Sequence, residues 1–281
     1  MRTGVKSLLF FNRFFKCPEH PLNLQNEGTK SYSRWQYEMG EQTIALYLKA
    51  STKEQMFSEK TVLDVGCGAG GKTMYYAAAG VDKIVGMDVV EHYREDAESF
   101  AAQIGVGDRF RFVCGDAAAM PFADNCFDTI IMNDAMEHVS DREGVLSECY
   151  RVLKAQGRLY LNFPPFNHPY GAHLKDVIGI PWVHLFFSDK TMIEAYKLLV
   201  RELPDAQQRI ALRIGADENG EEYFSYLNKI SIVYFRKMLE NSPFKVNYFK
   251  IEPIKRPLGF LSAIPFLNEF FSKMVVCILE K

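Results

Sequence analysis

The feature of this sequence that most limits its fold is a series of short apolar runs that alternate with helix-forming segments. The runs cover Thr61 to Val65, Lys83 to Met87, Arg109 to Cys114, Phe127 to Met132 and Gly157 to Phe163. Nearly continuous apolar strands that alternate with helices are typical of a parallel sheet covered on both faces. The pattern therefore predicts a doubly wound α/β fold with right-handed crossovers.

The segments between these runs carry helix signals. A leading amphipathic helix is expected at 34–50, because apolar residues recur at Trp35, Met39, Ile44 and Leu48. Further helices are expected at 72–79, 91–104, 189–203 and 229–240, and one is opened by the capping-box sequence Ser140-Asp141-Arg142-Glu143. Strand-like segments at 244–251 and 274–279 complete the predicted sheet.

The alternation breaks after Pro164 and Pro165, where a loop rich in Pro, Gly and His begins. We expect residues 166–228 to be an inserted lid, and residues 34–165 and 229–281 to form the α/β core. Residues 1–33 are expected to be an N-terminal segment of the same lid. Its aromatic stretch, Leu8 to Phe15, also fits an oligomer contact or an interfacial anchor, and the sequence leaves these alternatives open.

Composition narrows the class of partner. The 281 residues carry 33 basic and 35 acidic side chains, for a formal net charge of -2. This balance favours a small-molecule partner over nucleic acid. The six cysteines form no C-x-x-C pair, so we expect reduced thiols in the cytoplasm. No run of about 18 apolar residues predicts a membrane span, although peripheral contact stays open, as does the choice between monomer and homodimer.

The first strand leads into a glycine-rich turn, VLDVGCGAGG at 62–71, of the kind that binds nucleotides between a strand and a helix. Glycines there let the backbone adopt positive φ angles and approach a ligand closely. Asp88 follows Gly70 at the end of the second strand, where a carboxylate can bind a ribose diol. The two features together predict an adenosine-containing ligand.

Charge separates the candidate ligands. Asp64 lies two residues before the first glycine of the turn, where a carboxylate would repel a pyrophosphate. S-adenosylmethionine has no phosphate and carries an ammonium and a sulfonium group, so an acidic residue attracts it. We therefore expect S-adenosylmethionine as the cofactor, with an NAD(P)-dependent oxidoreductase as the alternative.

The sequence resembles the class I S-adenosylmethionine-dependent methyltransferases, especially small-molecule enzymes of the type 11 group. The similar segments are VLDVGCGAGG at 62–71, GMDVVEHY at 86–93, GDAAAMPFADNCFDTIIMNDAMEHV at 115–139 and VLSECYRVLKAQGRLYLNFP at 145–164. The resemblance covers about residues 34–164. It implies a Rossmann-like sheet of seven strands in the order 3-2-1-4-5-7-6, with the last strand antiparallel and a helical lid inserted after strand 5.

The resemblance also implies the cofactor-binding residues. Those expected around the methionine moiety are Asp64, Gly66, Cys67, Gly68 and Gly70, with Asp64 at the amino group. Asp88 is expected at the ribose, Val89 on the adenine, and Asp116 with Ala117 at the adenine amino group. A turn aspartate is the alternative role of Asp116. Those expected near the reactive methyl are Asn133 and Asp134. His138 is also expected to bind the cofactor, with the start of the following helix as its alternative role.

The acceptor side is expected in the loop after the fifth strand. His168, Tyr170 and His173 are the candidate catalytic residues, as a base or as an acceptor clamp. They and His184 lack the spacing of metal ligands, so no metal is expected. Aromatic residues between Phe163 and Tyr196 fit either a lid core or an apolar acceptor pocket. The expected activity is methyl transfer to O, N or C of a small, partly apolar or aromatic acceptor, with a non-catalytic cofactor-binding protein as the alternative.

Overall fold

The computed structural model describes residues 2–254 and 259–281, so Met1 and residues 255–258 of the predicted segments lie outside it. The strands of the main sheet are β1 (Thr61–Val65), β2 (Lys83–Asp88), β3 (Phe110–Cys114), β4 (Phe127–Asn133), β5 (Leu153–Phe163), β8 (Lys245–Pro253) and β9 (Ser272–Glu280). Their order is β3-β2-β1-β4-β5-β9-β8. The first five strands pair in parallel, and β9 is antiparallel to both of its neighbours. The predicted fold class and strand order are confirmed.

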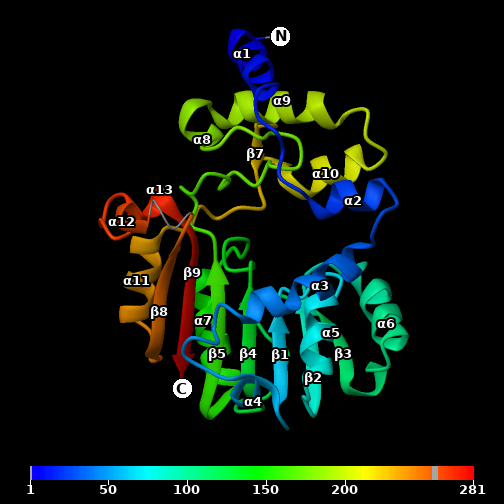
Figure 1. Ribbon diagram of the computed structural model, residues 1–281, viewed down its shortest axis with the longest axis vertical. Coiled ribbons are helices and arrows are strands. Elements are labelled where there is room, and N and C mark those ends of the chain that lie inside the picture. Colours follow the sequence, from blue (N-terminus) through cyan, green and yellow to red (C-terminus); the bar gives the residue numbers. More distant parts are fainter. Residues whose placement is uncertain (1, 255–258) are drawn as a thin grey trace.

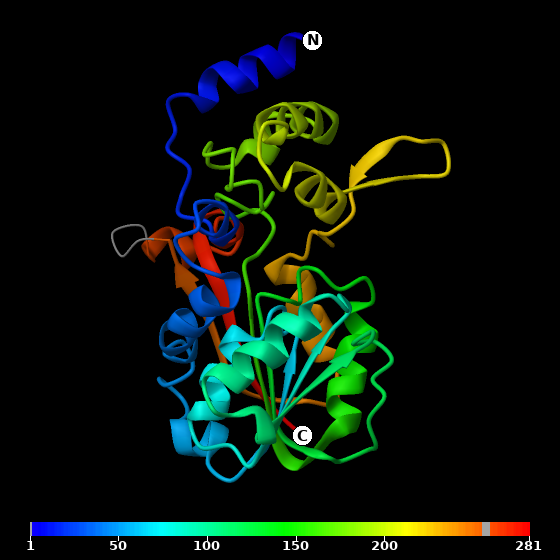
Figure 2. The same ribbon diagram turned by 90° about the vertical axis from the view of Figure 1, so that its right-hand side faces the viewer.

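Helices cover both faces of the sheet (Figure 2). One face carries α3 (Tyr32–Ile44), α4 (Lys53–Phe57), α5 (Gly71–Ala78) and α6 (Tyr93–Gln103). The other carries α7 (Arg142–Val152) and α11 (Ile232–Glu240). Neighbouring strand residues alternate between the two faces, so Val62 packs with the first layer and Leu63 with the second. A short 3-10 turn, η1 (Gly107–Arg109), precedes β3, and α12 (Gly259–Ser262) and α13 (Asn268–Phe271) lie between β8 and β9.

The buried face of the leading helix overlaps only partly with the one that its apolar spacing predicts. α3 begins at Tyr32 and buries Ser33, Gln36 and Gly40, whereas Leu48 lies beyond its end and is exposed. A Cβ atom on Gly40 would lie 2.3 Å from the ring of Tyr75 in α5. The predicted helix is present and Ile44 is fully buried as part of its apolar face, but Trp35 and Met39 are only half-buried, because small and polar residues let α3 approach α5 closely.

The N-cap of α7 also differs from the expected one by one residue. Asp141, not Ser140, precedes the helix, and its Oδ1 accepts a hydrogen bond of 2.8 Å from the amide of Gly144. Both residue types are good N-caps, so the capping-box pattern alone did not separate them.

A second group of elements, which we call the cap (residues 3–26 and 172–226), lies beyond the carboxyl ends of the parallel strands (Figure 1). It contains α1 (Thr3–Asn12), α2 (Pro21–Asn26), α8 (Val183–Phe186), α9 (Asp189–Val200), α10 (Ala206–Arg213), β6 (Ile214–Ala216) and β7 (Glu222–Phe224). Val5 and Leu8 of α1 are fully buried against α9 residues such as Ile193 and Tyr196. The N-terminal segment and the inserted segment therefore share one hydrophobic core.

A buried ion cluster holds the cap together. The Arg209 guanidinium donates to Asp176 Oδ2 and to Asn23 Oδ1, at 2.9 Å each. The Tyr196 hydroxyl donates to the same oxygen of Asp176 at 2.9 Å, and Arg213 Nη2 lies 3.6 Å from it. Asp176 is 2% exposed and Arg209 1%. Because Asn23 belongs to α2, the cluster also fixes the N-terminal segment to the inserted one.

Candidate functional site

The glycine turn (residues 66–71) connects the carboxyl end of β1 to α5. Gly66, Gly68 and Gly70 all have positive φ angles, and Gly70 is the N-cap of α5. A Cβ atom on Gly66 would lie 2.6 Å from the Cβ of Ala135, in the loop after β4. The turn therefore requires glycine both for its backbone conformation and for its close approach to that loop.

The start of α3 lies against this turn, which the sequence analysis missed. Ser33 Oγ donates to the carbonyl of Ala69 at 3.0 Å, and Gln36 Oε1 accepts from the amide of Gly71 at 3.2 Å. The ring of Tyr32 comes within 4 Å of where a Gly68 Cβ would lie. Burial raises the pKa of Tyr32 to about 12, so its hydroxyl stays neutral. No local motif marks Tyr32, because its contact depends on how α3 packs on α5.

Asp88 lies at the end of β2 with its carboxylate aimed at the glycine turn. Its Oδ2 accepts from the amide of Gly68 at 2.8 Å and its Oδ1 from the amide of Val90 at 3.0 Å. Burial raises the pKa of Asp88 above its usual value, although these backbone hydrogen bonds oppose the shift. The neighbouring Val89 is 66% exposed, which leaves an apolar surface free beside the carboxylate.

Asp116 and Ala117 follow β3 at the same edge of the sheet. Asp116 Oδ1 accepts from the amide of Ala118 at 2.9 Å, and its carbonyl accepts from the amide of Ala119. Asp116 thus makes the turn that we considered as its alternative role, while its exposed side chain keeps a second carboxylate oxygen. The assignment of Asp116 to the adenine amino group stays a prediction.

Asp64 is buried beneath the turn, with its Oδ2 accepting a hydrogen bond of 2.5 Å from the hydroxyl of Thr73. Burial raises the pKa of Asp64 to about 7, against the opposing effects of Thr73 and the Lys72 ammonium. Cys67 is buried as well, and its Sγ donates to the carbonyl of Gly68 at 3.6 Å. Asp64 can therefore form an ion pair with a cationic ligand only after its carboxyl group has lost its proton, which happens near neutral pH.

The side chain of Asn133, at the end of β4, is enclosed in a polar cluster within the core. Its Oδ1 accepts from the hydroxyl of Tyr47 at 2.5 Å and from Asn162 Nδ2, and its Nδ2 donates to the hydroxyl of Tyr76 at 2.8 Å. This amide is held by three buried side chains, those of Tyr47, Tyr76 and Asn162. If Asn133 contacts a reactive methyl group as expected, the contact would have to come from its backbone atoms.

Asp134 follows directly and has a positive φ of 53°. Its Oδ2 lies 2.8 Å from Lys72 Nζ, on the first turn of α5. Burial opposes ionisation of Asp134, but Lys72 outweighs that effect and lowers the pKa of the carboxyl group. The loop after β4 is thereby connected to the helix that begins at the glycine turn.

The structure brings three of the candidate histidines together, although they come from separate segments. The ring centroids of His138 and His173 lie 5.2 Å apart, and those of His173 and His168 lie 6.4 Å apart. The Tyr226 ring stacks on His138 at 5.6 Å. Burial lowers the pKa of His168 to about 3 and that of His173 well below its usual value, so both rings are neutral at pH 7. Tyr170 is half-buried in the turn that connects His168 to His173.

Three residues in or near this group, His138, His184 and Glu137, have different surroundings. His138 precedes the Asp141 N-cap by three residues and does not begin α7, so its alternative role was wrong. His184 packs with its ring 4.8 Å from that of Phe166, and, besides burial, its charge contributes to the lowered pKa of His168. The sequence analysis missed Glu137, a buried carboxyl group beside His138. Its signal was present in the sequence, since it lies in the same loop as the predicted Asp134 and His138.

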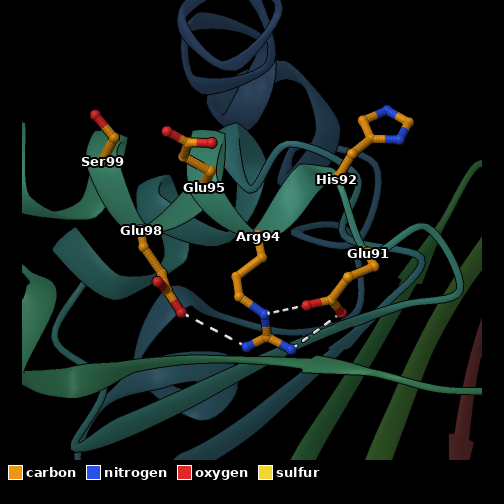
Figure 3. A pocket seen from close by; sticks show the side chains of 6 residues that line it. All are labelled: Glu91, His92, Arg94, Glu95, Glu98 and Ser99. Atoms are coloured by element: carbon orange, nitrogen blue, oxygen red, sulfur yellow. Dashed lines mark hydrogen bonds and ion pairs between the residues drawn. The ribbon is translucent and has the colours of Figure 1, made fainter.

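A surface hollow of about 510 Å³ lies on α6 beside this edge of the sheet (Figure 3). One arginine, Arg94, serves two of the glutamates that line it, since Arg94 Nε lies 2.6 Å from Glu91 Oε1 and Arg94 Nη1 lies 3.6 Å from Glu98 Oε1. His92 and Ser99 point away from these pairs. An open hollow lined by paired surface charges offers no apolar enclosure, so we do not place the chemistry there.

Residues 63–161 match a family model described as a methyltransferase domain. The chain is 39% identical over 104 residues to a sterol 24-C-methyltransferase of Pneumocystis carinii. This aligned segment covers 37% of this chain and 27% of that protein. It is 31% identical over 130 residues to a probable chloroplastic tocopherol O-methyltransferase of Oryza sativa subsp. japonica, covering 46% of this chain and 35% of that protein. The chain therefore spans only about a third of the length of these relatives or less.

Solved structures extend the likeness to most of the chain. The crystal structure of the YcgJ protein from Bacillus subtilis superposes with a TM-score of 0.52 over 85% of this chain and 97% of that one, at 20% sequence identity. At this identity the likeness shows the fold alone. No helix within residues 2–254 and 259–281 combines the length and the apolar character that crossing a membrane requires.

Proposed function

We propose, on the premise that this chain carries a class I S-adenosylmethionine-dependent methyltransferase domain and fold, that it transfers a methyl group to a small organic acceptor. The observation that carries the proposal is the glycine turn with the Asp88 carboxylate bonded to its Gly68 amide. Both lie at the carboxyl edge of the sheet, where open α/β sheets bind ligands.

The residues at this edge fit S-adenosylmethionine in their chemistry. Asp88 keeps lone pairs for a ribose diol, and the exposed Val89 offers an apolar face to an adenine ring. Asp134 supplies negative charge beside the turn, and Asp64 does so once its carboxyl group is ionised, which suits a ligand that carries cations. The same carboxylates would repel a pyrophosphate, so these residues disfavour a dinucleotide.

The cofactor supplies an electrophilic methyl group on sulfur. When bound, it would give that carbon to the acceptor atom and keep the electron pair of the broken bond on sulfur. In this chain the glycine turn and Asp88 hold the donor, and we propose that the cap excludes water as the lid. Where the acceptor is a hydroxyl or an ammonium, we propose that His168 or His173 takes up its proton; burial lowers the pKa of both rings, so this step requires the bound acceptor and cofactor to raise it. Tyr170 is proposed as a further contact of the acceptor.

The acceptor that we propose is small and partly apolar or aromatic. The rings of His138, His173 and Tyr226 lie together between the loop after β4 and the cap, which suits a flat or apolar molecule. Two of the relatives are named for a sterol and for tocopherol, which supports this class. All six cysteines are free thiols, which supports a reducing compartment such as the cytoplasm. We keep monomer and homodimer as the proposed states.

Calorimetric titration with S-adenosylhomocysteine and, separately, with NADH tests this proposal. We expect tight binding of S-adenosylhomocysteine alone, because NADH brings a pyrophosphate to an acidic site. Binding of NADH alone would identify a nicotinamide-dependent oxidoreductase instead. Transfer of a labelled methyl group across a panel of apolar acceptors then separates an enzyme from a protein that only binds the cofactor.

A further inference from the structure

Glu137 is the least satisfied charged group in the loop after β4. It is 3% exposed, and within residues 2–254 and 259–281 neither of its carboxylate oxygens has a hydrogen-bond partner. A buried carboxyl group without partners costs several kcal/mol, whether it is charged or must be kept protonated. Such a group in a well-packed loop indicates a ligand that satisfies it.

Two imidazole rings face this carboxylate. His138 Nε2 lies 3.8 Å from Glu137 Oε1, which is too far for a hydrogen bond. The ligand atoms of Glu137, His138 and His173 all lie within 4.8 Å of one another. Metal–nitrogen and metal–oxygen bonds of about 2.0–2.2 Å allow two ligands of one ion to be separated by up to about 4 Å. Small rotations of these side chains therefore close the three atoms around one ion.

The surroundings hold the ligands in the orientation that coordination requires. His138 Nδ1 lies 2.7 Å from the carbonyl oxygen of Tyr226, and a carbonyl only accepts, so the proton is on Nδ1 and the lone pair is on Nε2. A backbone carbonyl that fixes the tautomer in this way is a common partner of metal-bound histidine. Asn228 Nδ2 donates at 2.7 Å to the carbonyls of both Met136 and Val139, which holds the loop on either side of Glu137.

We propose that Glu137, His138 and His173 form a binding site for a divalent transition-metal ion of the zinc type. Two imidazole nitrogens and one carboxylate oxygen suit Zn²⁺, Fe²⁺ or Mn²⁺ better than Mg²⁺ or Ca²⁺, which prefer oxygen ligands. Three protein ligands leave a coordination position for water or another oxygen. Two cations of this region are already paired, since Lys72 lies 2.8 Å from Asp134 and Arg213 lies 3.6 Å from Asp176.

This site differs from the expectation that no metal is bound, which rested on spacing in the sequence. His173 follows His138 by 35 positions and belongs to the cap, so no short motif joins the ligands. The ion would connect the sheet edge to the cap. Metal binding can be measured without turnover, so the proposal does not depend on the acceptor or on methyl transfer.

The test is a titration of chelator-treated protein with Zn²⁺ by calorimetry, and with Co²⁺ by the visible absorption of the bound ion. We expect one equivalent to bind, with a cobalt spectrum of low coordination number. Glu137→Gln keeps the side-chain shape and removes the charged ligand. His173→Asn removes a ligand but tolerates the positive φ of 52° at that position. Each variant should weaken binding by about 10–100-fold or more.

His92→Asn is the matched control, because it removes an exposed histidine on α6 that is outside the site. Its metal affinity should equal that of the unmodified protein. Circular dichroism and the urea midpoint of each metal-free variant show whether it has folded, and if Glu137→Gln has not, His173→Asn decides. Zinc binding that is absent, or that both site variants leave unchanged, would overturn the proposal.

Discussion

The glycine turn and the cap are built from chain segments of very different separation. In the turn, Asp64 bonds to Thr73 nine positions away, and the amide of Gly68 to Asp88 twenty positions away. In the cap, Asn23 bonds to Arg209 across 186 positions. The turn is thus a local structure that rests on the sheet, whereas the cap combines local bonds, such as that of Tyr196 to Asp176, with contacts between segments far apart in the chain.

The two regions also differ in how they use charge. The sheet core is apolar and holds its amides in a neutral cluster around Asn133. The cap buries Asp176 between Arg209 and Arg213 in a core that includes Tyr196. Buried ion pairs are weak sources of net stability but are costly to break. The cap should therefore be the more fragile region, and four substitutions test this contrast.

Asp176→Ala should have the largest effect, because it removes the buried carboxylate that Arg209, Arg213 and Tyr196 share, and Arg209 keeps only Asp205 and Asn23. We expect the cap to lose about 3–5 kcal/mol of stability. Hydrogen exchange should show loss of protection in α9 and α10, while β1 and β4 stay protected. Equal loss in the sheet would contradict the separate stability of the two regions. Arg201→Ala is the control, since the exposed Arg201–Glu202 pair contributes little.

The same contrast explains what could be predicted from the sequence. The expected strand 61–65 coincides with β1 at both ends, because a β-branched run followed by glycines is a local signal. The face of α3 was predicted only in part, at Ile44, because Gly40 and Gln36 are buried through contacts with α5 and the glycine turn. Likewise, α1 was missed because Val5 and Leu8 are buried by a segment some 190 positions away.

The candidate site divides in the same way. Asp88 and the three glycines are together at the predicted edge, since the motif and the strand end are close in sequence. The cluster of His138 and His173 could not be predicted, because its geometry depends on how the cap returns to the loop after β4. Hydrophobic periodicity and motif spacing do not predict contacts between the sheet edge and the cap.

His168→Ala should have the next largest effect if the cap side supplies the base. We expect turnover on the true acceptor to fall by about 100-fold, because general bases contribute at least that much. Affinity for S-adenosylhomocysteine should stay the same, since the glycine turn is unchanged. His184→Ala, next to Phe166, is the matched control. Full turnover in His168→Ala would remove His168 from the proposed mechanism.

Asp88→Ala should affect only the turn side of the comparison. Loss of the charge-assisted hydrogen bonds to a ribose diol should weaken S-adenosylhomocysteine by about 1–3 kcal/mol in calorimetry. Asp116→Ala should cost less, because the Asp116 side chain is exposed and water competes for its hydrogen bonds, whereas Asp88 is partly buried. Unchanged affinity in Asp88→Ala would refute the ribose assignment, whereas hydrogen exchange in the cap should be the same in both variants.

Asp64→Asn should change the affinity for S-adenosylhomocysteine least at any single pH, but it should change the pH dependence of that affinity most clearly. Burial raises the pKa of Asp64 to about 7, so in the cofactor-free protein its proton stabilises the fold below that pH and the stabilisation is lost as pH rises through 7. A ligand ammonium needs the ionised form, so affinity for S-adenosylhomocysteine should rise by up to about tenfold per pH unit toward pH 7 and level off above it. Asp64→Asn removes this group from the titration, so its affinity should be lower at high pH and should lack this rise. Calorimetry in two buffers of different ionisation enthalpy should show proton release only in the unmodified protein. Identical pH profiles would place the ammonium elsewhere, and the turn would then hold its ligand without a buried charge.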